Sequence, residues 1–229
     1  MADNPRVASL RRFIEGWFLS YFIPNRARQP VPSGYEEHLS REGGNLPNVI
    51  QYLNEEHKKT IQIIINKMIK RIPLLEHVET ETTLDGRLVM RFKDGPFKEP
   101  FLPQFISDGT MKMLAYLVLI NDPEPPPLLC VEEPENGLHP KLMAVLAEEF
   151  RLHAEKTPAD KSTQVFISSH SPYFVSAIRP KELWIMERGS DGFAQVKRAD
   201  TISGVPEFIE EGADLGDLWY ENHLGGGNP

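Results

Sequence analysis

The sequence contains the stretch Leu128-Leu129-Cys130-Val131-Glu132-Glu133-Pro134, an apolar run that ends in two acids and a proline. A continuous apolar run of this kind is typical of a strand that is buried on both faces of a parallel sheet. The two carboxylates then lie at the carboxyl end of the strand, which is where open α/β sheets bind their ligands. Paired acids in that place suit a Mg²⁺ ion and an activated water. Two solvated acids at an exposed strand end are the simpler interpretation of this fragment.

The same design recurs further along the chain. We expect a strand at Thr163–Ser168, and it is followed by Ser169-His170-Ser171-Pro172. If the two strands are neighbours in a parallel sheet, their carboxyl ends meet at one edge, and His170 lies near Glu133. A single histidine is more often structural than functional, so its place at the second of two such strand ends is what makes it a candidate.

A third polar cluster precedes a predicted helix. The sequence there reads Phe105-Ile106-Ser107-Asp108-Gly109-Thr110. Ser107 is a good N-cap residue, and the free N–H groups of a helix N-terminus bind anions. These residues therefore form a candidate phosphate site, with an ordinary capped helix start as the alternative.

The predicted order of elements indicates the α/β class, with a mostly parallel sheet and flanking helices. From residue 108 onward helices and strands alternate, at 108–120, 128–132, 140–155, 163–168 and 182–187. The region before them differs: we expect helices at 4–23 and 47–72 and a β-hairpin at 78–92, turning at Asp85-Gly86. We therefore divide the chain into a helical arm or lid region, residues 1–75, and an α/β lobe, residues 76–229.

The composition is that of a globular protein with a packed core, 40% hydrophobic and 25% charged. The net charge of −8 restricts any DNA contact to a local patch. Arginines near the N-terminus, Arg26 and Arg28 among them, are interpreted as a solvated helix face, with a basic patch as the alternative. The single cysteine, Cys130, excludes an intrachain disulfide and a cysteine zinc site. Without a signal peptide pattern or a membrane-spanning run, we expect a cytoplasmic protein with no membrane partner.

Taken in order, these motifs resemble those of ABC-type ATPase heads. Their residues are most similar to the motifs of the RecF-, OLD- and SMC-like branch of "AAA family" ATPases. Residues 106–110 resemble the signature motif, and 128–133 resemble Walker B with the catalytic glutamate. Residues 134–140 look like the D-loop and 168–172 like the switch histidine loop. The resemblance covers residues 100–190 closely and implies the P-loop NTPase fold.

The resemblance also implies a role for each matching residue. Glu132 would hold Mg²⁺, Glu133 would orient and polarise the attacking water, and His170 would contact the γ-phosphate of ATP. In such heads the nucleotide lies between two subunits. The segments that would face that shared nucleotide or line the dimer contact are Ser107, Asp108, Gly109 and Thr110, together with Asn136 and His139. Asp108 stands where transporter heads carry glycine, and His139 where many D-loops carry aspartate.

One motif of such heads is missing from the sequence. A P-loop reads G-x-x-x-x-G-K-[ST], and none of the sixteen glycines is followed by lysine. We therefore expect the C-terminal half of a head, inactive alone, which uses ATP and Mg²⁺ only when complete. Its partner would be a second copy or a missing N-terminal lobe, with DNA or a protein as a further partner.

A non-catalytic half-head remains the alternative function. It would serve as a dimerisation or regulatory module, in DNA repair or in phage defence. A nuclease is disfavoured because no further acidic cluster of that kind follows His170. A glycosidase is disfavoured because Glu132 and Glu133 are neighbours in a strand and point to opposite faces.

Overall fold

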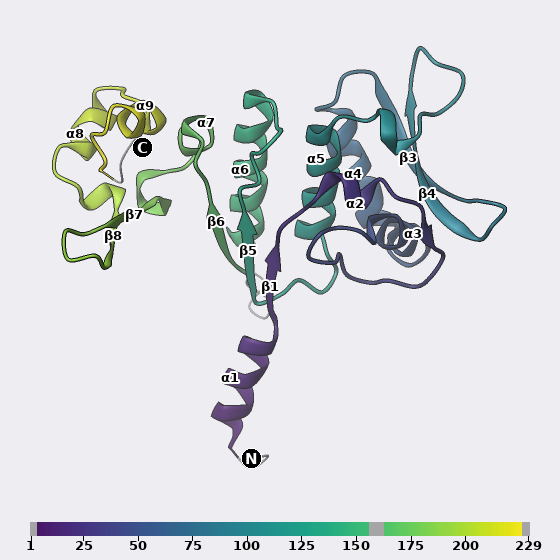
Figure 1. Cartoon of the computed structure of the whole chain (residues 1–229), viewed down its shortest axis with the longest axis horizontal. Coiled ribbons are helices and arrows are strands. Elements are labelled where there is room, and N and C mark those ends of the chain that lie inside the picture. Colours follow the sequence, from purple (N-terminus) through teal and green to yellow (C-terminus); the bar gives the residue numbers. More distant parts are fainter. Residues whose placement is uncertain (1–3, 156–162, 226–229) are drawn as a thin grey trace. The chain divides into compact units, whose positions relative to one another are not determined.

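The computed structural model describes residues 4–155 and 163–225, whose helices and strands are labelled in Figure 1. The chain divides into two compact units. Unit 1 comprises Met1–Leu138 and Glu149–Ser168, and unit 2 comprises His139–Glu148 and Ser169–Pro229. Helix α6 (Pro140–Glu155) contributes residues to both units. Each unit is described by itself.

The parallel sheet lies in unit 1. Its strands are β1 (Trp17–Ser20), β5 (Leu128–Glu132) and β6 (Gln164–Ser168), in the order β1-β5-β6, and both pairs are parallel. The register places the last residues of β5 and β6, Glu132 and Ser168, side by side. The predicted strands at 128–132 and 163–168 are therefore confirmed as neighbours in an α/β fold.

A second, antiparallel sheet in unit 1 has the order β2-β4-β3. Its strands are β2 (Val31–Pro32), β3 (Leu75–Thr82) and β4 (Arg87–Asp94). The predicted hairpin is confirmed, and Gly86 in its turn has a φ of 75°, which glycine adopts without strain.

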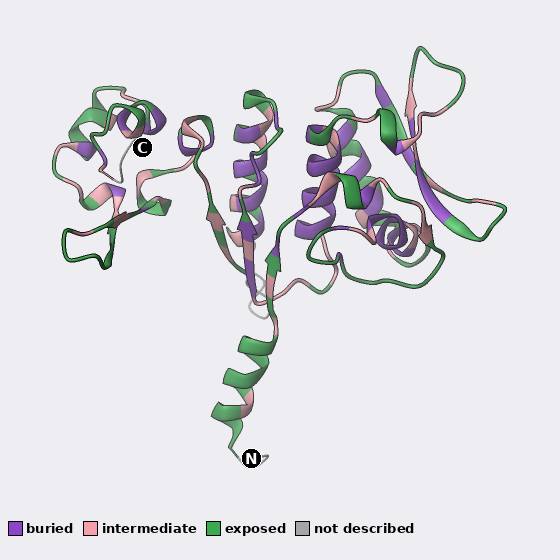
Figure 2. Cartoon of the chain, viewed as in Figure 1, coloured by how far each residue is buried: buried purple, intermediate pink, exposed green. Residues whose placement is uncertain are grey.

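The helices of unit 1 are α1 (Pro5–Glu15), α2 (Pro24–Ala27), α3 (Leu46–Glu56), α4 (Lys58–Ile69) and α5 (Asp108–Ile120), with a 3₁₀ turn at Pro103–Phe105. Helix α5 is apolar on all sides, and every residue from Met111 to Ile120 is buried (Figure 2). The ring of Tyr116 lies between those of Phe22 and Phe150, at centroid distances of 6.1 and 5.8 Å. This helix is the centre of the core, as expected for a helix that carries apolar residues on all of its faces.

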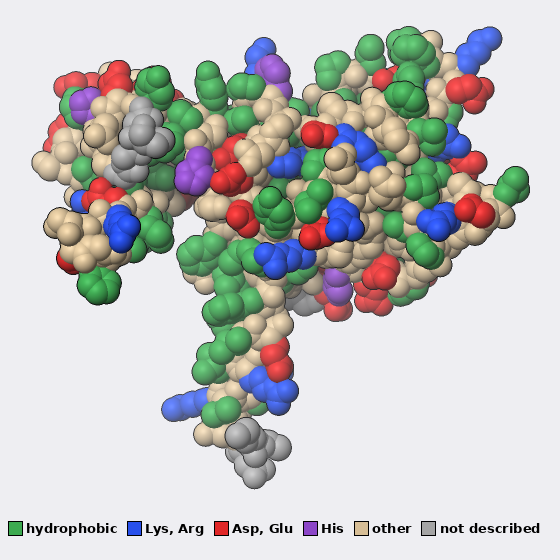
Figure 3. Space-filling model, in the orientation of Figure 1, with side chains coloured by type: hydrophobic (Ala, Val, Ile, Leu, Met, Phe, Trp, Pro, Cys, Tyr) green, Lys and Arg blue, Asp and Glu red, His purple; other side chains and the backbone are tan. Residues whose placement is uncertain are grey.

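The prediction of one N-terminal helix reaching residue 23 is wrong. Helix α1 ends at Glu15, Gly16 follows it, and Trp17–Ser20 pairs with β5 as strand β1. The aromatic and apolar residues here favour a strand once a partner strand is present. Helix α1 itself buries no residue, and Figure 3 shows hydrophobic side chains lying open along it beside basic ones.

The long helix predicted at 47–72 is also divided. His57 leaves the helical region, with φ −129° and ψ 51°, and separates α3 from α4. The Tyr52 hydroxyl and His57 Nε2 lie 2.8 Å apart, which holds the ring of His57 against the end of α3.

Unit 2 is small and has its own core. Besides its part of α6 it contains α7 (Pro172–Val175), a hairpin of β7 (Trp184–Arg188) and β8 (Ala194–Arg198), α8 (Val205–Glu210) and α9 (Leu215–Tyr220), with 3₁₀ turns at Pro180–Glu182 and Ala199–Thr201. A Cβ on Gly216 would lie 2.2 Å from the carbonyl oxygen of Pro172, so α9 packs on α7 only with glycine there. Among the described residues, no helix combines the length and the apolar character that crossing a membrane requires.

Replacing Tyr116 by phenylalanine is expected to stabilise the protein by about 1 kcal/mol. The side chain is fully buried, and its hydroxyl has no hydrogen-bond partner within the described ranges. Removing the hydroxyl therefore removes the free-energy cost of burying an unpaired polar group in the folded state. Urea denaturation would measure the change. Tyr52→Phe is the matched control: its hydroxyl lies 2.8 Å from His57 Nε2, so the same substitution should destabilise the chain. A destabilised Tyr116→Phe variant would contradict the argument.

Candidate functional site

The acidic edge of the parallel sheet has a strained backbone. Glu132 is exposed at the end of β5, and Glu133 is half-buried just beyond it, with a φ of 41°. A non-glycine residue in this region is uncommon and costs conformational energy, and such residues cluster at functional sites. The N–H of Glu133 donates to the carbonyl oxygen of Ser168 at 3.1 Å. The β5–β6 pairing thus continues for one residue and fixes Glu133 beside the end of β6.

The side chain of Glu133 is oriented by the loop that follows it. Asn136 Nδ2 donates to Glu133 Oε2 at 2.5 Å, and the Asn136 N–H donates to the Glu133 carbonyl oxygen at 3.3 Å. By its resemblance to a D-loop residue, Asn136 is expected at a contact between two heads. Within this chain, the amide of Asn136 holds the carboxylate of Glu133.

The start of α5 packs against this same loop. Ser107 caps α5 as predicted, accepting from the Thr110 N–H at 3.1 Å. A Cβ on Gly109 would lie 2.9 Å from the carbonyl oxygen of Gly137, so only glycine permits the approach. Gly137 in turn has a φ of 79°. The structure therefore brings the segments 107–110 and 136–138 into direct contact.

A buried lysine of α5 contacts the backbone of Glu133. Lys112 of α5 is 6% exposed, and its Nζ is 3.5 Å from the carbonyl oxygen of Glu133. Burial lowers the pKa of this ammonium group, while the carboxylates of Glu135, Asp108 and Glu133 act in the opposite direction. The lysine supplies positive charge close to the acidic residues at the sheet edge. Its role could not be predicted from the sequence, because it lies within an otherwise apolar helix.

Arg28 fixes the loop before α5. Its guanidinium donates to the carbonyl oxygens of Pro103, at 3.1 Å, and Ile106, at 2.7 Å, and to Asp108 Oδ1 at 2.5 Å. The side chain is only 11% exposed, so its interpretation as part of a solvated face is wrong. Because Arg28 offsets the charge of Asp108, an acid at this position need not repel an anion at the helix start.

Replacing Arg28 by lysine is expected to destabilise the protein by about 2 kcal/mol, because lysine keeps the charge but cannot reach all three acceptors. Thermal denaturation would measure the loss. Arg26→Lys is the matched control, since the Arg26 side chain is 66% exposed and its ion pair with Glu42 is long, at 3.4 Å. Equal effects of the two substitutions would rule out the clamping role of Arg28.

The two candidate histidines lie in unit 2. His139 Nδ1 accepts from the Lys141 N–H at 3.2 Å, so its ring caps the start of α6. His170 is exposed and follows Ser169, whose hydroxyl accepts from the Ser171 N–H at 3.1 Å. Unit 1 holds the other candidates, so the nearness of His170 to Glu133 stays a prediction.

The metal-ligating side chains at the sheet edge are too few to hold a metal ion by themselves. They suit Mg²⁺, which takes most of its ligands from a substrate and from water. No group of three or more metal-ligating side chains occurs in residues 4–155 and 163–225. Glu132 offers one exposed carboxylate at the sheet edge. Mg²⁺ is commonly bound in this way, through one or two carboxylates together with substrate phosphates and water.

Several solved structures are similar in fold. An SMC head bound to the C-winged helix domain of ScpA gives a TM-score of 0.47 at 12% identity, covering 64% of this chain and 44% of that one. A structure from work on ATP-driven dimerization and DNA stimulated activation of SMC ATPases gives a TM-score of 0.46 at 12% identity. The match covers 69% of this chain and 95% of that one. A third structure is the Pyrococcus furiosus Smc head domain with an extended coiled coil, bound to the C-terminal domain of ScpA. It gives a TM-score of 0.45 at 14% identity, and the match covers 74% of this chain and 46% of that one. The chain thus spans less than half the length of the first and third of these SMC chains.

The comparison with protein families is more direct. No curated protein matches the chain. Residues 4–176 match the family described as "AAA domain, putative AbiEii toxin, Type IV TA system". This match covers most of the chain, including β1, α5, β5 and β6 with the polar segments that follow them. The chain therefore belongs to this family of AAA ATPase domains.

Proposed function

We propose that this chain is the signature and Walker B portion of an ATP-hydrolysing head, and that its phosphate-binding loop comes from a segment outside these 229 residues. One observation carries the proposal. Glu133 is fixed at the carboxyl edge of the sheet by Ser168 and Asn136, and the loop that orients it touches the capped start of α5. A base and an anion-binding helix start in one arrangement suit phosphoryl transfer to water.

Each residue would then have a defined task. Glu133 would accept a hydrogen bond from the attacking water, with Asn136 holding its carboxylate in one orientation. Glu132 would hold Mg²⁺, which, when bound, neutralises charge on the phosphate oxygens. The N–H groups at the start of α5 would bind phosphate, with Ser107 fixing the geometry and Arg28 offsetting the charge of Asp108.

The parallel sheet supports the proposal that another element completes the head. By register, Leu19, Cys130 and Phe166 lie on one face together with Trp17 and, at its edge, Glu132. Trp17 is 53% exposed and Phe166 55%, although parallel sheets are normally covered by helices on both faces. Helix α1 buries no residue and does not supply the cover. We propose that an N-terminal lobe carrying the P-loop, or else a second copy, covers this face.

Nucleotide binding and hydrolysis test the proposal directly. Both would be measured for the 229-residue chain and for the chain extended by the sequence encoded immediately upstream. We expect the chain alone to be inert and the extended form to hydrolyse ATP. If the extended form binds nucleotide without hydrolysing it, the alternative of a regulatory module is favoured. If the chain alone hydrolyses ATP, the proposal of an external phosphate-binding loop is wrong.

A further inference from the structure

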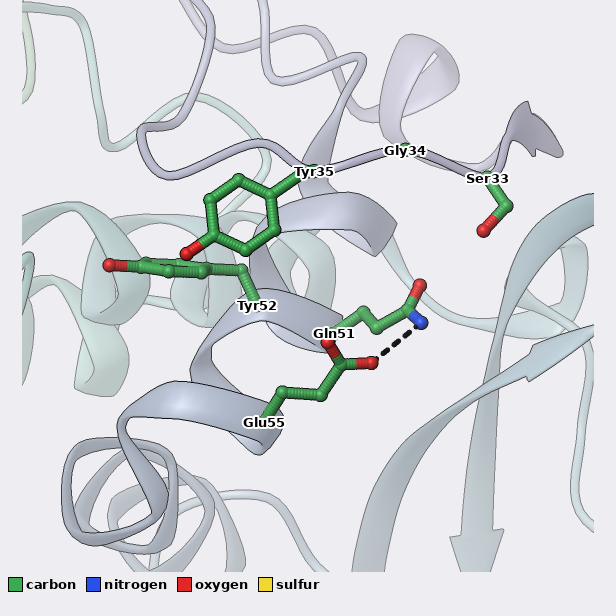
Figure 4. A pocket seen from close by; sticks show the side chains of 6 residues that line it. All are labelled: Ser33, Gly34, Tyr35, Gln51, Tyr52 and Glu55. Atoms are coloured by element: carbon green, nitrogen blue, oxygen red, sulfur yellow. Dashed lines mark hydrogen bonds between the residues drawn. The ribbon is translucent and has the colours of Figure 1, made fainter.

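Two polar groupings in unit 1 lie outside the motifs that resemble an ATPase head. In the pocket beside α3, shown in Figure 4, Gln51 Nε2 donates to Glu55 Oε1 at 2.9 Å. The rings of Tyr35 and Tyr52 meet there edge to face, at a centroid distance of 5.0 Å. These contacts lie within α3 and between α3 and the segment after β2. The second grouping is the buried ammonium of Lys112, and it differs because it reaches the candidate site.

Packing alone does not call for a charge at position 112. Lys112 is 6% exposed, and its neighbours Met111 and Met113 are completely buried. Burying an ammonium group is costly, whereas an unbranched apolar side chain would fill the same space without that cost. The presence of the ammonium is therefore better explained by the group that it contacts.

That group is the main chain of Glu133. Lys112 Nζ lies 3.5 Å from the carbonyl oxygen of Glu133, and the N–H of Asn136 donates to the same oxygen at 3.3 Å. The φ of Glu133 is 41°, in the left-handed region that few residues other than glycine adopt. Because the N–H of Glu133 is bonded to Ser168, a change of φ would rotate the carbonyl away from both donors. The two donors thus favour the strained conformation.

Lys112 is the one of these contacts that comes from α5. Ser168 belongs to the neighbouring strand and Asn136 to the loop that follows Glu133, whereas α5 begins at the capped segment 107–110. A helix moves as a unit, so the position of the ammonium follows the position of the helix start. Lys112 therefore connects the start of α5 to the backbone of Glu133.

The charge of Lys112 is balanced by acids close to it. Burial lowers the pKa of the ammonium, and Glu135 is the acid that opposes this effect most strongly. Glu135 is itself buried, at 4% exposed. A variant that removes the lysine alone leaves this buried carboxylate without its cation, which is destabilising. A variant that removes both charges avoids that effect.

We propose that Lys112 is a positioning residue: its ammonium holds Glu133 in the left-handed conformation and ties the direction of the Glu133 carboxylate to the position of α5. The importance of that direction for turnover rests on the proposed function, but the conformation of Glu133 can be measured in the chain itself. A ligand that shifts the start of α5 would change the direction of the carboxylate through this contact.

Three variants of the 229-residue chain separate positioning from packing. Lys112→Met removes the ammonium and keeps an unbranched side chain. Lys112→Met/Glu135→Gln also removes the buried carboxylate, so it should fold even if the single variant does not. Met113→Leu is the matched control, because it changes a buried neighbour on the same helix, conserves volume and removes no charged group.

NMR would report the conformation of Glu133 in each variant. A residue with positive φ gives a strong nuclear Overhauser effect between its own amide and α protons, because these two protons lie close together. We expect a strong signal at Glu133 in the unmodified chain and in Met113→Leu, and a weak one in the double variant and in any folded Lys112→Met. The proposal is overturned if the double variant keeps the strong signal, or if Met113→Leu loses it to the same extent.

Kinetics of the extended form provide a second measurement. Removing Lys112, alone or with Glu135, is expected to lower kcat about tenfold, because a misaligned base slows the chemical step. The KM for ATP should stay the same, since the buried lysine contacts Glu133 and not the nucleotide. An unchanged kcat in the double variant, with or without a raised KM, overturns the positioning role. If no form of the protein hydrolyses ATP, the proposed function fails, and the NMR result still decides whether Lys112 holds Glu133.

Discussion

Replacing Glu133 by glutamine is expected to lower the ATP turnover of the hydrolysing form by about 10²–10⁴-fold, the usual contribution of a positioned general base. Glutamine has nearly the same shape and still accepts a hydrogen bond, but it cannot take a proton from water. Nucleotide affinity should change little, because Glu133 lies at the sheet edge with its carboxylate held by Asn136. Steady-state hydrolysis and equilibrium nucleotide binding would be measured on the same preparation.

Two companion variants make this result specific. Glu124→Gln changes an exposed acid in the loop before β5 and should leave turnover unchanged. Asn136→Ala removes the group that orients the Glu133 carboxylate and should lower turnover by about tenfold, without affecting binding. If Glu133→Gln hydrolyses ATP as fast as the unmodified protein, the assignment of the base is wrong, whatever the source of the P-loop.

The elements predicted best are those whose limits are written in the local sequence. Helix α5 begins after Ser107, which is an N-cap by type and accepts from Thr110 as such a residue should. Strand β5 is an apolar run that ends at two acids and a proline, and the structure gives it the same bounds. Helix α6 begins at Pro140, a favoured first residue of helices. In these cases local propensity and tertiary packing agree.

The N-terminal region could not be predicted in the same way, because its structure depends on a distant partner. Residues 17–20 have helical spacing with the residues before them, yet they form β1 by pairing with β5, far along the chain. The hydrogen bonds of a strand come from its neighbour. A pattern read along one segment cannot show that a second segment offers those bonds, so periodicity alone favoured the wrong element.

The supporting residues of the candidate site were missed for a related reason. The acceptors of Arg28 lie in and beside the loop that begins at Pro103, and Lys112 reaches the backbone of Glu133 from inside α5. Neither residue has a motif around it. An arginine in a loop and a lysine within an apolar helix acquire their meaning only from the groups that face them. The motifs therefore supply the residues that we propose for the chemistry, and the structure adds the residues that contact them.

Replacing Glu149 by alanine is expected to destabilise unit 1 by about 3 kcal/mol, the lower end of the range for breaking a buried ion pair by removing one partner. The side chain of Glu149 is only 5% exposed. Its two oxygens accept from Lys67 Nζ at 2.5 Å and Arg71 Nη2 at 2.6 Å, so it joins α6 to the end of α4. The two cations are 27% and 23% exposed, and water can partly replace the lost carboxylate. This partial rehydration is why we expect the lower value.

Urea denaturation followed by circular dichroism would measure this loss, and the neighbouring residue provides the control. Glu148 is exposed on the same helix, so Glu148→Ala should change the free energy of unfolding by less than about 0.5 kcal/mol. Glu149→Gln keeps the size and the acceptor oxygen and removes the charge, so its effect should fall between the two. Because the pair is buried, the difference between Glu149→Ala and Glu148→Ala should persist at high salt. Equal effects of the two alanine substitutions, or a difference that salt abolishes, would mean that α4 and α6 are joined by apolar packing and not by this carboxylate.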